Sequence, residues 1–302
     1  MKKIVILVAV IVAALTTAVV QSCRSNQSVS RVLKFNLEKG KGYDYEIIMN
    51  MDQQMMGQDT KMMLTGNYTM LVTEDDGTVK TLTGKYKSFK MNMKMMGIEI
   101  DIDTDKPSPP MTEDEMKMDP AKMMTRIFAG ITGKSFTIKV DAEGNIVEVK
   151  GFPEIIQSIV DSSGMGEDIK RQMYASLKDQ FNEQNIKDQF AQVFTIFPNK
   201  EVKVGDSWDK TYSTGGKMPA KNTITYTVKE IEGDHVTLTT KSKLESLNKS
   251  DMEINGEQAG TLLVDSKTGL VINSEFDLNM HTKVQGMEIE TKAKGKIKGK
   301  AL

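Results

Sequence analysis

The chain has 302 residues, of which 27% are charged, with 40 basic and 41 acidic side chains and a net charge of −1. Because the charges are mixed and no basic block occurs, the composition excludes the usual classes of nucleic-acid-binding protein. A single cysteine excludes internal disulfides, so a hydrophobic core must hold the folded part, and the chain is long enough to bury one.

The start of the chain predicts a secretory leader. It opens Met-Lys-Lys, residues 4–20 are uncharged and mostly apolar, and Cys23 follows closely. The apolar run is typical of a signal peptide. Residues 20–23, Val-Gln-Ser-Cys, resemble a bacterial lipobox, which implies a lipoprotein signal peptide over residues 1–22 and lipidation at Cys23. Several acyl chains, at about 0.8 kcal/mol per buried methylene, would hold the protein on a membrane. The alternative is an ordinary signal peptide with an incidental cysteine.

After the leader, residues 23–31 are polar and predict a short tether. Residues 32–152 then predict a first β-rich half, because apolar and polar residues alternate, as at Ile47, Met49 and Met51. Such alternation is typical of antiparallel strands with one face in water and one in the core. Turn signals rich in Asp and Gly separate the strands, which indicates a meander of long hairpins.

The middle of the chain changes to helical periodicity. A helical insertion is predicted near residues 112–130, with a capping box at Thr112 and a second start at Asp119-Pro120. A longer helical segment is predicted over residues 153–194, where apolar residues recur every three to four positions. Each predicted helix has one apolar stripe, so we expect these helices to lie against a sheet.

Residues 195–302 return to a period of two and predict a second β-rich half. Residues 202–208 repeat the apolar, glycine and aromatic positions of residues 37–43, and residues 264–271 resemble residues 140–147. Residues 276–289 resemble residues 89–100, with Leu278 in the place of Met91. These matches suggest an internal duplication, with chance similarity between amphipathic hairpins as the alternative. The predicted fold class is α+β and mostly antiparallel, with long hairpins curled into one or two half-barrels and helices packed across from the middle of the chain.

Methionine is unusually frequent, with 23 in the chain and 16 of them between positions 49 and 124. Thioethers favour Cu(I), flexible methionines suit an apolar ligand, and methionines also fill ordinary cores. Leucine replaces Met91 in the apparent repeat and the chain has two histidines, so packing or a ligand lining is favoured over metal. The residues predicted to line an apolar site are Met49, Met51, Met91, Met93, Met95, Leu278 and Met280.

We predict no catalytic, cofactor-binding or metal site. The sequence has no nucleophile elbow, phosphate-binding loop or dinucleotide fingerprint. Asp101, Asp103 and Asp105 resemble the start of a calcium loop, but Lys106 and Thr112 stand where that loop needs glycine and glutamate. A pair of carboxylates acting as acid and base stays open, although nothing ranks one pair above another.

The single tryptophan, Trp208, ends the segment Phe-Pro-Asn-Lys-Glu-Val-Lys-Val-Gly-Asp-Ser-Trp. A core aromatic at a strand start is favoured over a ligand-stacking residue, because Tyr43 has the equivalent place in the first half. This segment, the lipobox and the two Val-Asp hairpins resemble an uncharacterised family of bacterial cell-envelope lipoproteins, a domain of unknown function. The resemblance implies a β-rich exported domain. The half-barrels are similar in architecture to the periplasmic lipoprotein carriers, which cup acyl chains.

The expected function is that of a non-enzymatic, membrane-anchored periplasmic lipoprotein that binds an apolar ligand or an envelope protein partner, without cofactor or nucleic acid. The alternatives are a hydrolase that uses surface carboxylates and a methionine-rich Cu(I)-binding protein. Arg24 follows Cys23 in place of aspartate, which resembles a bacterial sorting signal for the outer membrane, facing the periplasm. The ligand hypothesis predicts a cavity lined by the inward Met and Ile positions.

Overall fold

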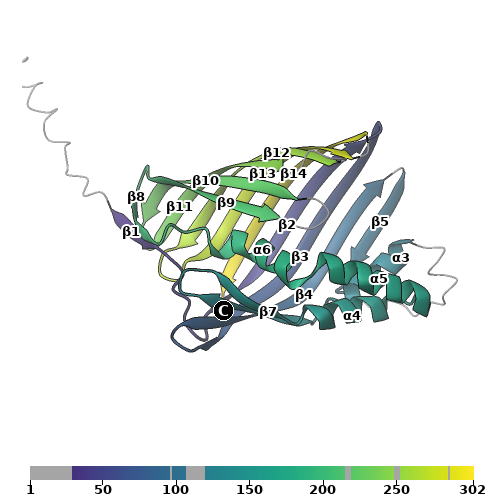
Figure 1. The fold of residues 1–302 in the computed structure, drawn as a ribbon, viewed down its shortest axis with the longest axis horizontal. Coiled ribbons are helices and arrows are strands. Elements are labelled where there is room, and N and C mark those ends of the chain that lie inside the picture. The colour runs from purple at the N-terminus through teal and green to yellow at the C-terminus, as the bar shows by residue number, and fades with distance from the viewer. Residues whose placement is uncertain (1–28, 96, 107–119, 215–218, 248–251, 285) are drawn as a thin grey trace, which may run out of the picture.

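The computed structural model describes residues 29–95, 97–106, 120–214, 219–247, 252–284 and 286–302, and one large antiparallel sheet dominates it (Figure 1). The predicted leader, the lipidation site Cys23 and the helix starts at Thr112 and Asp119 lie outside these residues. The chain is mostly antiparallel β-structure with helices from its middle, as the sequence predicted.

The first β-rich part contains the strands β1 (Ser30–Leu33), β2 (Gly42–Met55), β3 (Gln58–Asp75), β4 (Val79–Met95), β5 (Ile98–Asp103), β6 (Ser135–Asp141) and β7 (Ile146–Lys150). The helices are α3 (Pro120–Ala129), α4 (Phe152–Ser162), α5 (Glu167–Gln180) and α6 (Glu183–Phe194). The second β-rich part contains β8 (Lys200–Lys203), β9 (Ser207–Thr214), β10 (Ala220–Glu232), β11 (His235–Ser246), β12 (Met252–Asp265), β13 (Leu270–Val284) and β14 (Met287–Ala301).

The two β-rich parts form one continuous sheet, apart from β1 and β8, which form a separate two-stranded sheet. Of its 12 strands, eleven follow the order β7-β6-β4-β3-β2-β14-β13-β12-β11-β10-β9, and the twelfth, β5, pairs with the far end of β4. The first long strand, β2, lies antiparallel to the last, β14, over the full run from Tyr43 opposite Ala301 to Met55 opposite Ile289. The first and last long strands therefore lie side by side at the centre of the sheet, and β7 and β9 lie at the two ends of this strand order.

The predicted tether extends too far into the fold. Residues 23–31 were expected to be a polar tether, but β1 begins at Ser30 and pairs with β8 over Ser30–Leu33. Leu33 is fully buried in the core, together with Phe35 and Leu37 just after it. The two apolar residues Val32 and Leu33 are adjacent and do not alternate with polar ones, so the period-two pattern did not reveal this short strand.

The sheet has two chemically different faces, and we call the one that carries the helices the inner face. Tyr43, Tyr45, Ile47, Met49 and Met51 point to the inner face from β2, because successive side chains of a strand alternate. The same alternation holds along the neighbouring strands, where Tyr45 faces Tyr68 and Met51 faces Met62. This pattern places the predicted hydrophobic positions on one side and the charged ones on the other.

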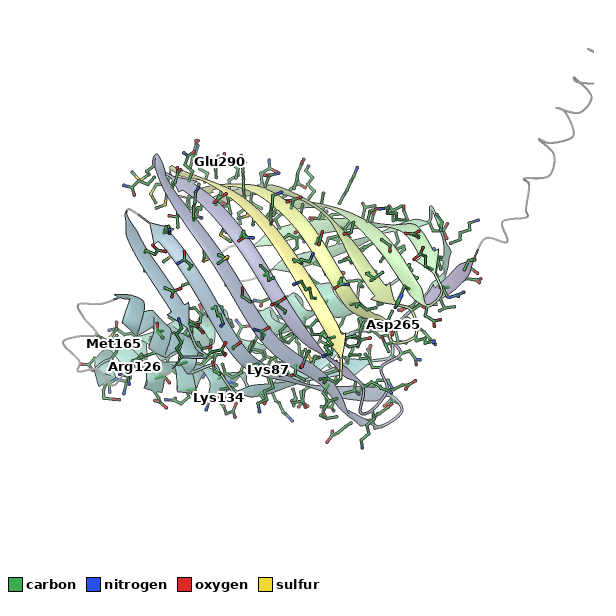
Figure 2. All side chains as sticks on the ribbon, turned by 180° about the vertical axis from the view of Figure 1, so that it is seen from behind. Lys87, Arg126, Lys134, Met165, Asp265 and Glu290 are labelled. Carbon is green, nitrogen blue, oxygen red and sulfur yellow. The ribbon has the colours of Figure 1, made fainter. Side chains whose placement is uncertain are left out.

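The outer face carries a ladder of paired charges, which Figure 2 shows on the side turned away from the helices. Five lysines at every second position of β14 point outward and face acidic residues of β2 and β13. Lys294 lies 3.0 Å from Asp277, and Lys298 lies 2.9 Å from Glu46. Each such exposed pair contributes little by itself, but the alternation of sign across the strands removes repulsion between the lysines.

The helical segment lies along the inner face (Figure 1). Helix α4 buries Ile155, Ile156, Ile159 and Val160, which are the four apolar positions of its predicted stripe. Helix α6 begins after Asn182, whose side-chain oxygen accepts a hydrogen bond from the Asn185 backbone N–H at 2.9 Å. The helices therefore use the single apolar stripe that the sequence predicted.

Two turns at the strand starts are built alike. The Gly40 N–H donates to the Val72 carbonyl at 2.8 Å, and the Gly205 N–H donates to the Val228 carbonyl at 2.9 Å. Both glycines have a positive φ, of 81° and 93°. These are the turns of the 37–43 and 202–208 matches, so the matched positions share a structural role. Whether they descend from a duplication stays a prediction.

Candidate apolar binding site

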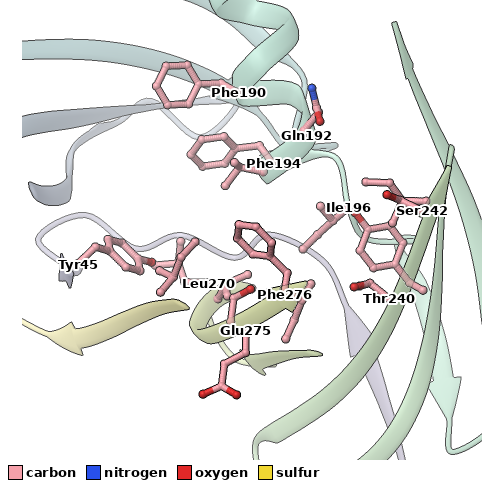
Figure 3. A pocket seen from close by; sticks show the side chains of 18 of the residues that line it. Tyr45, Phe190, Gln192, Phe194, Ile196, Thr240, Ser242, Leu270, Glu275 and Phe276 are labelled. Carbon is pink, nitrogen blue, oxygen red and sulfur yellow. The ribbon is translucent and has the colours of Figure 1, made fainter. Parts of the chain in front are cut away.

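A cavity of about 300 Å³ lies between helix α6 and the inner face of the sheet (Figure 3). Phe190 and Phe194 of α6 line it from one side, and Leu270 and Phe276 of the sheet line it from the other. The remaining lining is mostly aromatic or aliphatic, with a few uncharged polar groups. Glu275 borders the cavity, but its carboxylate points away from it (Figure 3).

A second cavity, of about 290 Å³, lies beside the first under helix α4. Its lining is almost wholly apolar and includes Ile155 and Ile159 of the helix with Phe89 of the sheet. Gly66 forms part of the floor, in the middle of β3 between Ile47 and Phe89 on the neighbouring strands. A Cβ atom added at Gly66 would meet nothing within 4 Å, so the missing side chain leaves open space.

Tyr68 lines both cavities and separates them. Its ring stacks on Tyr45 with the centroids 5.1 Å apart, and Tyr86 faces it from the next strand. Burial, with Tyr86 as a further cause, raises the pKa of Tyr68 to about 12. Burial also raises the pKa of Tyr45 and Tyr86. The phenols therefore stay neutral, and the wall between the cavities is apolar apart from hydroxyl groups.

Glycines on the sheet make room for the aromatic rings of the inner face. A Cβ atom at Gly295 would lie 2.1 Å from the Phe276 ring, and one at Gly84 would lie 2.2 Å from the Phe136 ring. Glycine in a strand interior normally weakens it and marks close approach by another group. Here the rings lie flat over these two glycines, whereas nothing covers Gly66.

The predicted apolar lining shares the inner face but does not surround either cavity. Met49, Met51, Met91, Met93, Leu278 and Met280 occupy inner-face positions on β2, β4 and β13. Neither cavity is lined by any of these six residues. Met91 is buried with Ile100 and Ile102, and the others are half-buried further along the strands. Met95 pairs with Thr60 on β3, and its side chain lies outside the described residues.

The sequence reasoning therefore missed most of the residues that line the cavities. They include aromatic residues of β2–β4, residues of α4 and α6, and residues of β10–β14, with Met70 as the one methionine among the lining residues. The aromatic residues looked like ordinary core positions. The available signal was a pair of glycines four residues apart, at alternate inner positions, in each of β12 and β14, which indicates that another group packs closely against the sheet there.

A family model described as a family of unknown function (DUF6263) matches residues 76–271, which is more than half of the chain. The chain belongs to this family. The matched segment covers helices α4 to α6, and in both cavities it covers part of the lining, including Phe194 and Ile155. No curated protein matches the sequence.

Solved structures show distant similarity to this DUF6263 protein. Lipovitellin, in a structure titled for its lipid–protein interactions, has a TM-score of 0.49 and 9% identity, and covers 88% of this chain. The chain spans about a quarter, 26%, of that lipovitellin chain. The translocator domain of the autotransporter NalP from Neisseria meningitidis has a TM-score of 0.36 and 6% identity, over 88% of this chain and 90% of that chain. The β-domain of the Bordetella autotransporter BrkA has a TM-score of 0.34 and 8% identity, over 85% of this chain and 98% of that chain. None of these values supports an argument about function.

The hairpins that carried the family resemblance have a structural role in this DUF6263 protein. Gly144 and Gly269 end the two Val-Asp turns with φ of 92° and 73°. A Cβ atom would lie 2.3 Å from the Phe194 carbonyl oxygen at Gly144 and 2.4 Å from the Lys34 carbonyl oxygen at Gly269. Both turns also approach Phe35, so the motif positions pack the end of the first cavity rather than perform chemistry.

Many carboxylates of the described residues form surface ion pairs. Asp103 and Asp105, from the failed calcium loop, lie 3.5 Å and 3.0 Å from Lys90. The Lys150 and Lys139 side chains lower the pKa of Glu148, and that of Lys87 lowers the pKa of Asp44. A general acid needs the opposite shift. Within the described residues, no group of three or more His, Cys, Asp or Glu side chains could hold a metal ion.

Trp208 packs at the edge of the sheet. Its ring stacks on Tyr226, with the centroids 5.7 Å apart, and its indole N–H donates to the Ile196 carbonyl at 2.7 Å. Tyr226 and Ile196 line the first cavity, whereas Trp208 does not. Trp208 is therefore the core aromatic at a strand start that the sequence favoured, and it packs behind the lining residue Tyr226.

No described helix is both long and apolar enough to span a membrane.

Proposed function

We propose that this DUF6263 protein is a non-enzymatic lipoprotein of the cell envelope that binds an apolar molecule between its helices and the inner face of its sheet. The observation that carries the proposal is the pair of adjoining cavities that meet at Tyr68. A core that served packing alone would fill such space, because protein interiors are packed about as densely as organic crystals.

The size and lining of the cavities suit an apolar ligand. Ligand pockets are roughly 300–1,000 Å³, mostly apolar, and have a few polar groups that fix orientation. Each cavity is at the lower end of this range, and together they offer an elongated space. A rigid ring system or an acyl chain would displace little ordered water there, because the walls offer few hydrogen-bonding groups.

The proposed location rests on the sequence. The lipobox-like segment and the single cysteine support acylation at Cys23, and Arg24 supports the outer membrane, facing the periplasm. In this proposal the sheet acts as a half-barrel whose matching turns derive from a duplication, and the helices close its open side. The β1 strand begins seven residues after Cys23, which holds the folded part within about 25 Å of the membrane surface.

The first experiment is native mass spectrometry of residues 24–302, which keep every described helix and strand, purified without detergent. We expect adducts of lipid size that organic extraction removes. A matched comparison uses Gly66→Val, which fills the second cavity, and Thr65→Val, whose position on the same strand points to the outer face. Adducts that are equally abundant in both variants would place the ligand elsewhere, and a clean mass after exposure to envelope lipids would contradict the proposal.

Cu(I) binding is a second candidate, favoured by one observation. Met51, Met62 and Met93 occupy directly opposed inner-face positions on three adjacent strands. Opposed Cβ atoms lie about 5 Å apart, so three thioethers could approach one soft ion. Replacing all three by leucine keeps their apolar volume. If the row holds copper, competition with a chromogenic Cu(I) chelator will show one tightly held ion in the parent chain and none in the triple variant.

A further inference from the structure

One charged side chain stands on the inner face without a described ionic partner. Lys210 lies in β9 between Trp208 and Tyr212, and strand alternation places all three on the inner face. Lys210 is half-buried, whereas the residues on either side of it, Asp209 and Thr211, are exposed on the outer face. At the other inner-face positions of the described long strands, β2–β4 and β9–β14, register and alternation place uncharged side chains except at Lys80 and Asp75, which form an ion pair with each other.

No described hydrogen bond or ion pair involves the Lys210 ammonium. Asp209, the nearest acidic residue in sequence, accepts a hydrogen bond from the Thr225 hydroxyl at 2.6 Å on the outer face. Burial lowers the pKa of Lys210, and no acidic neighbour offsets this effect. A partly desolvated cation without a counter-ion is an unfavourable arrangement, so it is rarely retained without a use.

Lys210 stands beside the polar end of the first cavity. Directly opposite it on β10 is Ile224, and Ser242 and Gln258 follow in the same row on β11 and β12. These three residues line the first cavity. Since neighbouring strands lie about 4.8 Å apart, the ammonium on its four-carbon stem reaches this end of the cavity.

A second polar group at the same end lacks a full set of partners. Asn222 lines the cavity diagonally across from Lys210, opposite Tyr212. Its amide N–H lies 3.5 Å from the Gln192 side-chain oxygen, longer than an ordinary hydrogen bond, and its own side-chain oxygen is buried with no partner. The amide nitrogen makes one weak hydrogen bond, so an N–H stays available to a ligand.

From this juxtaposition we infer that the ligand is a long-chain carboxylate, with its head group against Lys210 and Asn222 and its chain running between Phe194 and Phe276. The inference rests on the proposed function and specifies its ligand class. A single carboxylate supplies the missing counter-charge for Lys210 and accepts a hydrogen bond from the Asn222 amide. A neutral chain would leave the lysine desolvated and unpaired, and the cavity lining offers no second cation for a doubly charged head.

The test compares dodecanoate with 1-dodecanol as competitors of N-phenyl-1-naphthylamine, a dye that fluoresces in apolar sites, on residues 24–302. We expect dodecanoate to compete at least about tenfold better, as a charge-assisted hydrogen bond implies. Lys210→Met keeps the apolar stem and should remove this preference while leaving dodecanol unchanged. Lys210→Arg should keep it. The control is Lys221→Met, which removes an exposed lysine from the outer face of the adjacent strand β10.

The outcomes separate the two proposals. The carboxylate inference is wrong, and apolar binding stands, if Lys210→Met prefers dodecanoate over dodecanol as strongly as the parent chain does. The same holds if dodecanol displaces the dye from the parent chain as well as dodecanoate does. If the dye binds the parent chain but neither amphiphile displaces it, the inference also fails. If the dye itself does not bind, the proposed function fails before the head group is at issue.

Discussion

Filling the second cavity should stabilise the protein and close a ligand site at the same time. The perturbation is Gly66→Val in the middle of β3, where an added Cβ atom meets nothing within 4 Å and where φ is not in the left-handed region. Valine is a good strand residue, so the backbone can keep its conformation.

The expected gain can be worked from the open space. Valine adds three carbon atoms, and each buried carbon is worth about 0.8 kcal/mol, or about 2.4 kcal/mol together. Replacing glycine also lowers the entropy of the unfolded chain by about 0.5 kcal/mol, which roughly offsets the rotamer freedom that valine loses. The free energy of unfolding should therefore rise by about 2 kcal/mol, which for a chain of this size raises Tm by roughly 4–8 °C.

The matched control is Gly84→Val on the neighbouring strand β4. Gly84 also lies on the inner face, but an added Cβ atom would lie 2.2 Å from the Phe136 ring. That ring is held between Tyr86, Phe152 and Phe190 at centroid distances of 5.1–5.6 Å, so it cannot move aside freely. We expect a loss of about 3 kcal/mol.

Urea unfolding and dye displacement measure the two effects together. The reasoning is refuted if Gly66→Val destabilises the protein as much as Gly84→Val, since the space above Gly66 would then be filled. A variant that gains stability and still binds ligand with unchanged affinity would show a real cavity that is not the ligand site.

Three further predictions follow from the described contacts. Burial raises the pKa of Tyr68 to about 12, so the folded state holds this proton more tightly than the unfolded state, and stability should fall by about 3 kcal/mol between pH 10 and 12. The difference in absorbance at 295 nm between the parent chain and Tyr68→Phe should show this phenol titrating only with unfolding, and a difference that appears near pH 10 in the folded protein would contradict the burial. Gly269→Ala should cost about 3 kcal/mol in urea unfolding, because φ is 73° and the added atom meets the Lys34 carbonyl oxygen, whereas Gly286→Ala, with open space, should cost about 1 kcal/mol. A dodecanoate brominated along its chain should quench the single tryptophan, Trp208, through its stacked neighbour at the cavity wall, and unbrominated dodecanoate should not.

The fold followed from the sequence where one local pattern was sufficient. Alternation identified the long strands, and the apolar stripe of α4 identified its buried face. The pairing of β2 with β14 could not be predicted in this way. These two strands are the first and last long ones, and a local pattern in either strand does not say which distant strand it pairs with. For the same reason the sequence left open whether the β-rich halves form one sheet or two.

The candidate site was predicted less well than the fold, for a physical reason. Methionine frequency pointed to the right face of the sheet, since Met49 and Met91 lie there. It pointed to the wrong part of that face, because a cavity depends on where helices cover a sheet without filling it. Only the docked position of α6 shows that the space lies at Tyr45 and Tyr68, several residues away from the methionines.

The two faces of the sheet explain how such a lining can be tolerated. Glycines and small residues occupy inner positions of β14, including Ala293, Gly295 and Gly299, and they give that strand little apolar contact of its own. On the outer face the same strand carries its five lysines between rows of acidic residues, as in the pair of Lys298 with Glu46. The ladder holds the register of the central strands from the outside, since a one-residue slip would turn the lysines toward the apolar face. The inner-face side chains are therefore not needed to fix the register, so they can leave room for a ligand.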